Sequence, residues 1–498
     1  MEIMELPLEV LHIILFYPVL ARGVKRALRL RLICKTFASA LYPALFETHI
    51  MDHYRSNPIG SDVWQTRIQR GAEKLWQEYL AYRVMNERDP TVGRFVEIRQ
   101  IAQAVCQEKE STLALTATVE ALCCLVLTHG TNVGREWKKW WWPLLKGSEE
   151  RANLGLNTLL SAAAYFDLLP LARRLIAEGD RPTSHNYLFS PPIQLAAQAG
   201  HVAMLQLFQE QLPESNFEPF SVTGAAIRGD INIVKLALRL PARTRQSDGN
   251  DDDMTGRQFG SIKHTSETGK SILIARSYTS SPEVYDYLTK SLAPWPNTLL
   301  DAYDDLRKHS ELGNLSMVRH LLHLGVPVQL SGWEFETPLV MACRGWHNDV
   351  VDLLLEYGAD PNFASQKLYP LFPLHVSATA SNLSLARTLL DHGALPNRPG
   401  GRLSNDKLPV LWWAFAREHT EMIRLLLERG ASLDGGLGDL FGKGWVGKSL
   451  AEMTYDLGYH SMSVILREYG FKIIGPLPYT VANAPFWRGW AEVRAVFP

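Results

Sequence analysis

The stretch that decides the fold runs over Thr337–Asn362 and reads TPLVMACRGWHNDVVDLLLEYGADPN. Thr337 and Pro338 suit the first turn of a helix, where the backbone N–H groups have no partner within the helix. Apolar residues then recur at helical spacing in two short blocks on either side of His347. Gly358 follows where a helix ends in a left-handed cap, and the residues after it have turn composition. Such a helix pair cannot bury its own apolar faces, so copies of it must stack.

Less regular copies of this unit recur between residues 151 and 470. A small residue keeps the same offset in several of them, at Ala163, Ala196, Ala225 and Ala414. The pattern predicts about nine stacked units, in an array that grows in one dimension rather than around one large core.

The unit resembles the ankyrin repeat, whose hallmark is T-P-L-H-x-A at a period near 33 residues. Thr337, Pro338, Leu339 and Ala342 keep the register of that hallmark. The chain departs from the pattern at one position, because Trp346 occupies the slot of the usual glycine between the two helices. We therefore expect the connecting turn of this unit to be distorted. In ankyrin repeats a histidine at the position of His347 or His201 usually bonds the backbone of its neighbours, and we expect the same here.

Two segments do not fit the repeat. Residues 241–268 are polar and lack the apolar content of a helix pair, so we expect an extended, mobile loop between repeats. Residues 471–498 are rich in proline and aromatic residues, and we expect them to cap the open end of the stack.

Residues 1–50 contain two helical patterns that carry a second family signature. Leu6-Pro7-Leu8-Glu9-Val10 and Ile14-Leu15 match an opening LP-x-E helix, and Leu30–Phe37 matches a later V-C/S-K/R-x-W/F segment. In this order they resemble the F-box motif, which commonly precedes a repeat-type recognition domain. Between this region and the array, residues 51–150 form a helical linker region by their apolar periodicity. The predicted fold is therefore all-α: an ankyrin-repeat solenoid preceded by a small F-box-like domain and the linker helices.

Net charge, cysteine spacing and the length of apolar runs limit the classes of function that we expect for this chain. The formal net charge of −1 argues against a general binder of nucleic acid or anionic membranes. Five scattered cysteines without zinc-type spacing indicate a reduced intracellular protein with no metal site. No signal peptide precedes the first helix, and no apolar run reaches the roughly 20 residues that span a bilayer. We expect a soluble protein of the cytoplasm or nucleus that needs no cofactor.

One catalytic motif has to be weighed. Gly442–Ser449 reads GKGWVGKS and satisfies the P-loop pattern G-x4-G-K-S. A P-loop needs a buried strand before it and a long helix after it. The residues before Gly442 have loop composition, and the chain shows no parallel-sheet pattern. We therefore expect no enzyme and no catalytic residue, with a P-loop NTPase as a remote alternative.

Together the two resemblances imply a substrate receptor of a Skp–cullin–F-box ubiquitin ligase. The expected contacts to the Skp-type adaptor, and through it to the cullin ligase, are Leu6, Pro7, Val10, Ile14 and Leu32. The ankyrin groove would hold a target protein whose identity the sequence does not give. Aromatic residues just before helix starts are the expected target contacts: Trp333, Phe335 and Trp445. The alternative is an ankyrin scaffold or inhibitor protein with no link to a ligase.

Overall fold

The structure, a computed structural model, consists of helices joined by turns and contains no strand among the residues it describes. The described residues are 35–47, 49, 73–89, 94–108, 114–132, 156–184, 186, 188–212, 219–238, 267–291, 299–330, 336–363, 372–397, 410–416, 419–432 and 460–470. The fold class is therefore all-α, as predicted.

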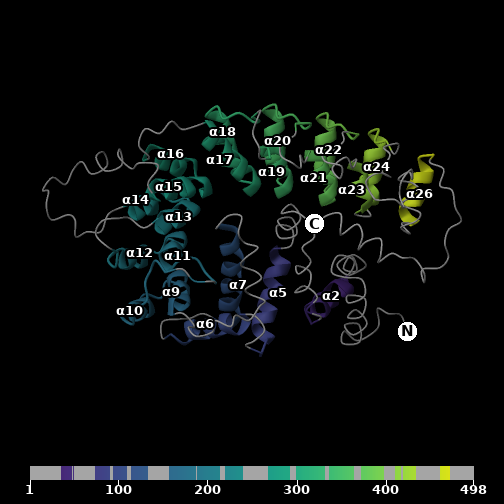
Figure 1. Ribbon diagram of the computed structural model, residues 1–498. Helices are drawn as coiled ribbons and strands as arrows, with labels where there is room; N and C mark the ends of the chain where they lie inside the picture. The colour runs from purple at the N-terminus through teal and green to yellow at the C-terminus, as the bar shows by residue number, and fades with distance from the viewer. Residues whose placement is uncertain are drawn as a thin grey trace, which may run out of the picture. The chain divides into compact units, whose positions relative to one another are not determined.

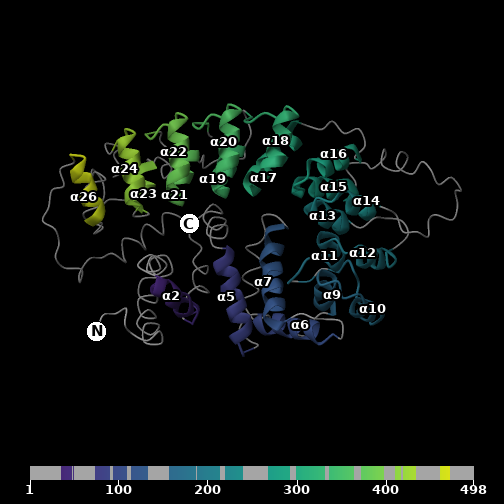
Figure 2. The same cartoon turned by 180° about the vertical axis from the view of Figure 1, so that it is seen from behind.

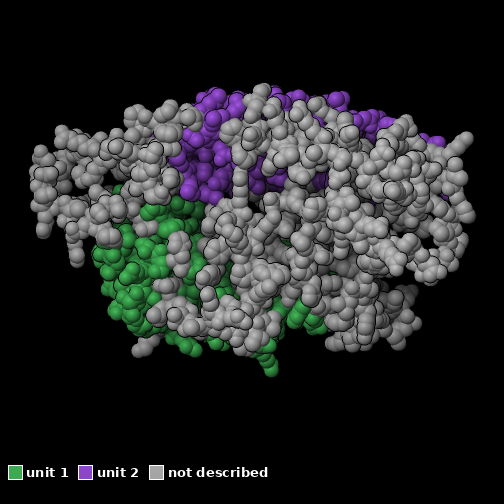
Figure 3. Space-filling model, viewed as in Figure 1, with its two compact units in different colours: residues 1–59, 72–250 green, residues 60–71, 251–498 purple. Residues whose placement is uncertain are grey.

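The chain divides into two compact units, coloured separately in Figure 3. Unit 1 comprises residues 1–59 and 72–250, and unit 2 comprises residues 60–71 and 251–498. The division at residue 250 falls inside the predicted array, within the polar segment 241–268.

In unit 1 the described helices that precede the repeats are four in number (Figure 2). They are α2 (Lys35–Glu47), α5 (Glu73–Asn86), α6 (Phe95–Gln107) and α7 (Leu115–Asn132). Helices α5, α6 and α7 pack on one another, and α6 also packs on the first repeat helix, α9. The buried Arg83 guanidinium links α5 to α6, because it bonds Tyr79 and Glu87 and lies 4.6 Å from the ring centre of Phe95.

The repeats of unit 1 are three helix pairs. They are α9 (Leu156–Tyr165) with α10 (Leu169–Ala177), α11 (Pro192–Ala199) with α12 (Val202–Gln209), and α13 (Pro219–Arg228) with α14 (Ile231–Ala237). The first helices α9, α11 and α13 pack against one another in chain order. This is the stacking that the sequence requires, since each pair buries its apolar face on the next.

Unit 2 continues with the same kind of pair (Figure 1). Its helices are α15 (Glu267–Tyr278) with α16 (Pro282–Ser291), α17 (Leu299–Leu312) with α18 (Leu315–His323), α19 (Pro338–Gly345) with α20 (Asn348–Glu356), α21 (Pro373–Ala380) with α22 (Leu383–Asp391), α23 (Val410–Ala416) with α24 (Thr420–Glu428), and α26 (His460–Glu468). Within this unit the first helices α17, α19, α21 and α23 pack side by side. Among the second helices, α18 packs on α20, and α24 packs on both α22 and α26.

Proline marks the start of several first helices, namely α11, α13, α19 and α21. Helices α11, α19 and α21 each have proline in their first turn and are 8 residues long. In α19 the side chain of Thr337 also caps the helix by accepting the N–H of Val340. No proline stands at the start of α15 or α17, and these helices are longer, with 12 and 14 residues. The predicted helix start at Thr337 and Pro338 is confirmed.

The ends of the helices also follow the sequence, with one exception. Gly358 has φ +85°, so the predicted left-handed cap is confirmed. The predicted distortion at Trp346 is wrong. Trp346 has φ 62° and ψ 30°, close to the 84° and 22° of Gly200 in the equivalent turn. Its N–H bonds the last turn of α19, as the N–H of Gly200 bonds the last turn of α11. The tryptophan therefore adopts the glycine conformation, at a cost of about 1 kcal/mol for an L-residue.

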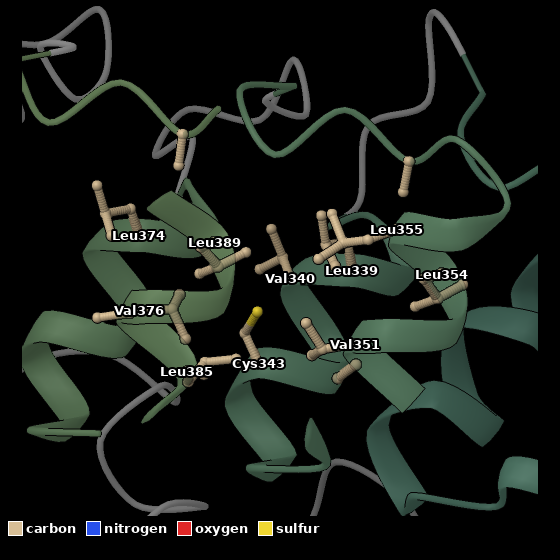
Figure 4. Close-up of a cluster of buried hydrophobic side chains, with 14 of the residues drawn as sticks. Leu339, Val340, Cys343, Val351, Leu354, Leu355, Leu374, Val376, Leu385 and Leu389 are labelled. Atoms are coloured by element: carbon tan, nitrogen blue, oxygen red, sulfur yellow. The ribbon is translucent and has the colours of Figure 1, made fainter. Parts of the chain in front are cut away.

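A continuous apolar core runs through unit 2 from α17 to α26. Figure 4 shows its centre, where side chains of α19, α20, α21 and α22 point toward one another. The labelled residues are Leu339, Val340, Cys343, Val351, Leu354, Leu355, Leu374, Val376, Leu385 and Leu389. Small residues such as Ala342 lie among them fully buried and let neighbouring helices approach closely.

Two predicted segments lie mainly or wholly outside the described residues. The predicted loop 241–268 lies outside them except for its last two residues, which form the first turn of α15. The predicted cap 471–498 lies outside them entirely.

Candidate functional site

The residues predicted to bind the adaptor, Leu6, Pro7, Val10, Ile14 and Leu32, lie outside the described residues. Of the F-box-like segment, the structure describes only α2 and His49, so Lys35–Phe37 form the first turn of a helix. The predicted target contacts Trp333, Phe335 and Trp445 and the P-loop-like Gly442–Ser449 also lie outside. The described repeat surfaces flank these positions in the sequence.

The described residues resume at Glu336, which directly follows Phe335. Two side-chain contacts fix the chain there. The Glu336 carboxylate accepts a hydrogen bond from Arg344 Nη1 at 2.9 Å, and both side chains are about 10% exposed. Thr337 adds its capping bond to Val340 N–H. The predicted contacts Trp333 and Phe335 therefore stand just before a helix start that is fixed by an ion pair and a cap.

On the same side of the array, asparagine side chains join the turns of successive repeats. Asn362 Nδ2 donates to the carbonyl of Gly393 at 2.8 Å, and Asn362 Oδ1 accepts the N–H of Leu395 at 2.8 Å. One repeat later, Asn397 Nδ2 donates to Gly430 at 2.7 Å and Asn397 Oδ1 accepts the N–H of Ser432 at 2.6 Å.

The preceding repeat uses a glutamine in the same place. Gln329 Oε1 accepts the N–H of Asp360 at 3.0 Å. We call Gln329, Asn362 and Asn397 the amide ladder. Because each member satisfies backbone groups of the next turn, the ladder holds this edge of the array in register and presents it as one rigid surface.

The opposite end of the helix pairs carries the histidines. His347 Nε2 lies 3.1 Å from the carbonyl oxygen of Glu311, and His201 Nε2 lies 3.0 Å from that of Tyr165. Both carbonyls belong to the preceding repeat, so the predicted backbone-bonding role of these histidines is confirmed. A side chain at Gly313 would collide with the ring of His347, which explains the glycine there.

Trp346 is the large aromatic residue that this edge exposes. It is 40% exposed and stands at the far end of α19 from Thr337. The helix that follows it, α20, has three exposed carboxylates, Asp349, Asp352 and Glu356. The sequence predicts only that Trp346 distorts a turn. Its exposure to solvent depends on how the repeats stack.

The described residues bear on two kinds of site, metal centres and membrane-spanning helices. They contain no group of three or more His, Cys, Asp and Glu side chains that could hold a metal ion. None of the described helices is both long and apolar enough to span a bilayer.

Comparisons with known proteins agree with this geometry. The family model for ankyrin repeats (three copies) matches residues 306–400, which cover the second half of α17 and all of α18 to α22. The chain therefore contains ankyrin repeats, and such arrays use their extended surfaces to bind other proteins.

Two curated proteins are similar to parts of the chain. The palmitoyltransferase AKR1 of Lachancea kluyveri is 39% identical over 90 residues, which is 17% of this chain. The transient receptor potential channel pyrexia of Drosophila melanogaster is 33% identical over 128 residues, which is 26% of this chain. The chain spans only 12% of the length of each relative.

Proposed function

We propose that this protein is the substrate receptor of a Skp–cullin–F-box ubiquitin ligase. The observation that carries the proposal is the order of two elements, an F-box-like segment in residues 1–50 followed by an array that contains ankyrin repeats. The first would bind a Skp-type adaptor, and the second would hold the target protein. The chain itself would make or break no covalent bond.

The array suits the holding of a target because its surface is preorganised. The amide ladder orders one edge of the described repeats, and the Glu336–Arg344 ion pair fixes the chain directly after Phe335 in the sequence. Binding through a rigid surface loses less conformational entropy than binding through a mobile one. We therefore keep Trp333, Phe335 and Trp445 as the proposed target contacts.

The adaptor half is tested by co-purification with a Skp-type adaptor. Buried apolar anchors dominate such interfaces, and truncation of one costs roughly 2 kcal/mol or more. The variant Leu6→Ala with Pro7→Ala should lose the adaptor and keep the helical circular-dichroism signal of the array. Glu2→Ala is the matched control and should keep the adaptor. If the double variant retains the adaptor, the proposed docking surface is wrong.

The proposed binding of the target protein is tested with one variant before α19 in the sequence and one variant after it. Trp333→Ala should weaken capture of a target that the wild-type protein binds, without a change in thermal stability. Trp346→Asn is the matched control, since asparagine tolerates the left-handed conformation and this residue lies at the far end of α19. Equal loss of binding in both variants would contradict recognition through the edge that carries Trp333.

The second candidate is an ankyrin scaffold or inhibitor protein with no ligase link. The observation in its favour is that the ankyrin match covers residues 306–400 and does not depend on the N-terminal segment. An array that captures its target while the full-length chain binds no Skp-type adaptor would select this candidate.

A further inference from the structure

At one position of the repeat, two helix pairs have a large polar side chain where the other described pairs have a small one. This position lies five residues before the residue that precedes the second helix of a pair, and in most of the described repeats it holds a small, fully buried side chain. These residues are Ala163, Ala196, Ala225, Ala342, Ser377 and Ala414. In α15 the equivalent residue is Arg276, and in α17 it is His309. Both are buried, with 2% and 0% of their surface exposed.

The register of α15 follows from its backbone. Tyr285 N–H donates to the carbonyl of Ser281, as Val351 N–H donates to that of His347 one turn into α20. Ser281 therefore corresponds to His347 and Arg276 to Ala342. In this turn, however, the N–H of Ser281 donates to the side chain of Thr279 at 3.2 Å. The N–H of His347 instead bonds the carbonyl of Ala342.

A charged network fills the space between these two repeats. Arg276 Nη2 lies 2.7 Å from Asp305 Oδ2 of α17, and their side chains are only 3% and 6% exposed. The hydroxyl of Tyr285 in α16 donates to the same carboxylate oxygen at 3.0 Å. The guanidinium of Arg276 lies 5.1 Å from the ring centre of Tyr285. We call Arg276, Tyr285 and Asp305 the charged seam.

Polar contacts continue the charged seam on both sides. Lys308 Nζ donates to Ser277 Oγ at 3.0 Å and lies 3.2 Å from the ring centre of Tyr278. Between the second helices, His320 Nε2 lies 2.9 Å from Asp286 Oδ1. Hydrogen bonds and ion pairs thus join α15–α16 to α17–α18 at several points.

The other junctions of unit 2 are apolar. The core that runs from α17 to α26 includes residues from each of the described helices in that range, but Tyr285 is its only described member from α15 or α16. A buried ion pair contributes little net stability, since desolvation offsets the attraction, whereas apolar burial is directly favourable. In a stack that is stabilised by its nearest-neighbour contacts, the junction with least apolar burial opens first.

We propose that the charged seam is a hinge of the array, at which α15–α16 detach reversibly from α17–α18 while α17–α26 stay folded. Opening would separate the surface of α15–α16 from that of the later repeats of unit 2, so it would change which targets these repeats can span together. The inference concerns the array alone and does not depend on the proposed adaptor.

Hydrogen exchange with mass spectrometry on the full-length chain tests the hinge. The amides of α15 and α16 should exchange at least about tenfold faster than those of α19–α22, in line with a lower opening free energy. Equal protection of the two groups would overturn the proposal.

A variant separates the hinge from simple fraying of a terminal repeat. Arg276→Met, Tyr285→Phe and Asp305→Leu together replace the charged seam by apolar side chains of similar size. Such replacements of buried ion pairs are often neutral or stabilising. Exchange in α15 and α16 should slow by about tenfold, with α19–α22 unchanged. Unchanged exchange in α15 and α16 would assign their opening to fraying and overturn the hinge.

A second variant covers the case in which the triple variant does not fold. Asp305→Asn removes the charge that faces Arg276 and leaves a side chain of the same size. It should speed exchange in α15 and α16, because a buried charge without its partner is costly. No acceleration would show that the ion pair does not hold this junction closed. Val351→Ala is the matched control, since it should speed exchange around α19–α20 and leave α15–α16 as they are.

Discussion

The amide ladder makes a quantitative prediction at Asn362. Asn362→Ala removes two hydrogen bonds of 2.8 Å, one to the carbonyl of Gly393 and one from the N–H of Leu395. Each such bond contributes about 0.5–1.5 kcal/mol net, and both are solvent-exposed, so the loss is about 1–2 kcal/mol. That free energy corresponds to a factor of about 5–30 in a local opening equilibrium.

Hydrogen exchange measures this change where it occurs. In the Asn362→Ala variant, the turn after α22 should exchange about 5–30 times faster, while α15–α18 stay as in the wild type. Asn362→Asp should give an intermediate result. It keeps an acceptor for Leu395 N–H and places a carboxylate opposite the carbonyl of Gly393.

Asn348→Ala is the matched control. Asn348 makes a weak bond of 3.4 Å to Ser384 and is not part of the ladder, so its loss should change stability by less than about 0.5 kcal/mol. If Asn362→Ala alters exchange no more than Asn348→Ala, the ladder does not hold the repeats in register.

Two further predictions concern pH and the polar segment. Burial lowers the pKa of His309 from 6.5 to about 3, so the folded state keeps it neutral while the unfolded state binds a proton. The contribution of His309 to stability is therefore fully present above pH 6.5 and is lost as pH falls toward 3. Thermal denaturation at pH 7 and pH 5 should show a smaller loss for His309→Ala than for the wild type, and an equal loss would contradict this. Deletion of residues 241–264 should leave the melting temperature nearly unchanged, because their composition does not offset the entropy of ordering them. A large fall in the melting temperature would instead show that the segment is part of the packed array.

The parts of the fold that sequence predicted are those set by local chemistry. Thr337 and Pro338 start a helix, and Gly358 ends one, because capping and backbone conformation depend on the residue itself. The error at Trp346 shows the limit of that reasoning. The hydrogen bonds of the turn hold a left-handed conformation even without glycine, and their strength is not readable from the tryptophan.

The charged seam was missed because it depends on the stack. Arg276 and Asp305 are 29 positions apart in the chain, and only the register of two repeats brings them to 2.7 Å. A signal did exist, since Arg276 and His309 stand where other repeats have alanine or serine. The amide ladder was read only as turn composition, although Asn362 and Asn397 share the same offset after Gly358 and Gly393.

The predicted contacts for adaptor and target are the part of the account that rests on sequence alone. Leu6, Pro7 and Trp333 were chosen from motif position and from the order of the elements. Their proposed roles are contacts with other proteins, so each role is tested with the partner protein present.

The most direct measurement of the proposed function is the mass of the complex formed with a purified Skp-type adaptor, determined by native mass spectrometry. The full-length chain should form a one-to-one complex, and residues 51–498 should form none while they retain the helical signal of the array. A truncated chain that binds the adaptor as well as the full-length chain, or a full-length chain that does not bind it, would contradict the assignment of residues 1–50 as the link to a ubiquitin ligase.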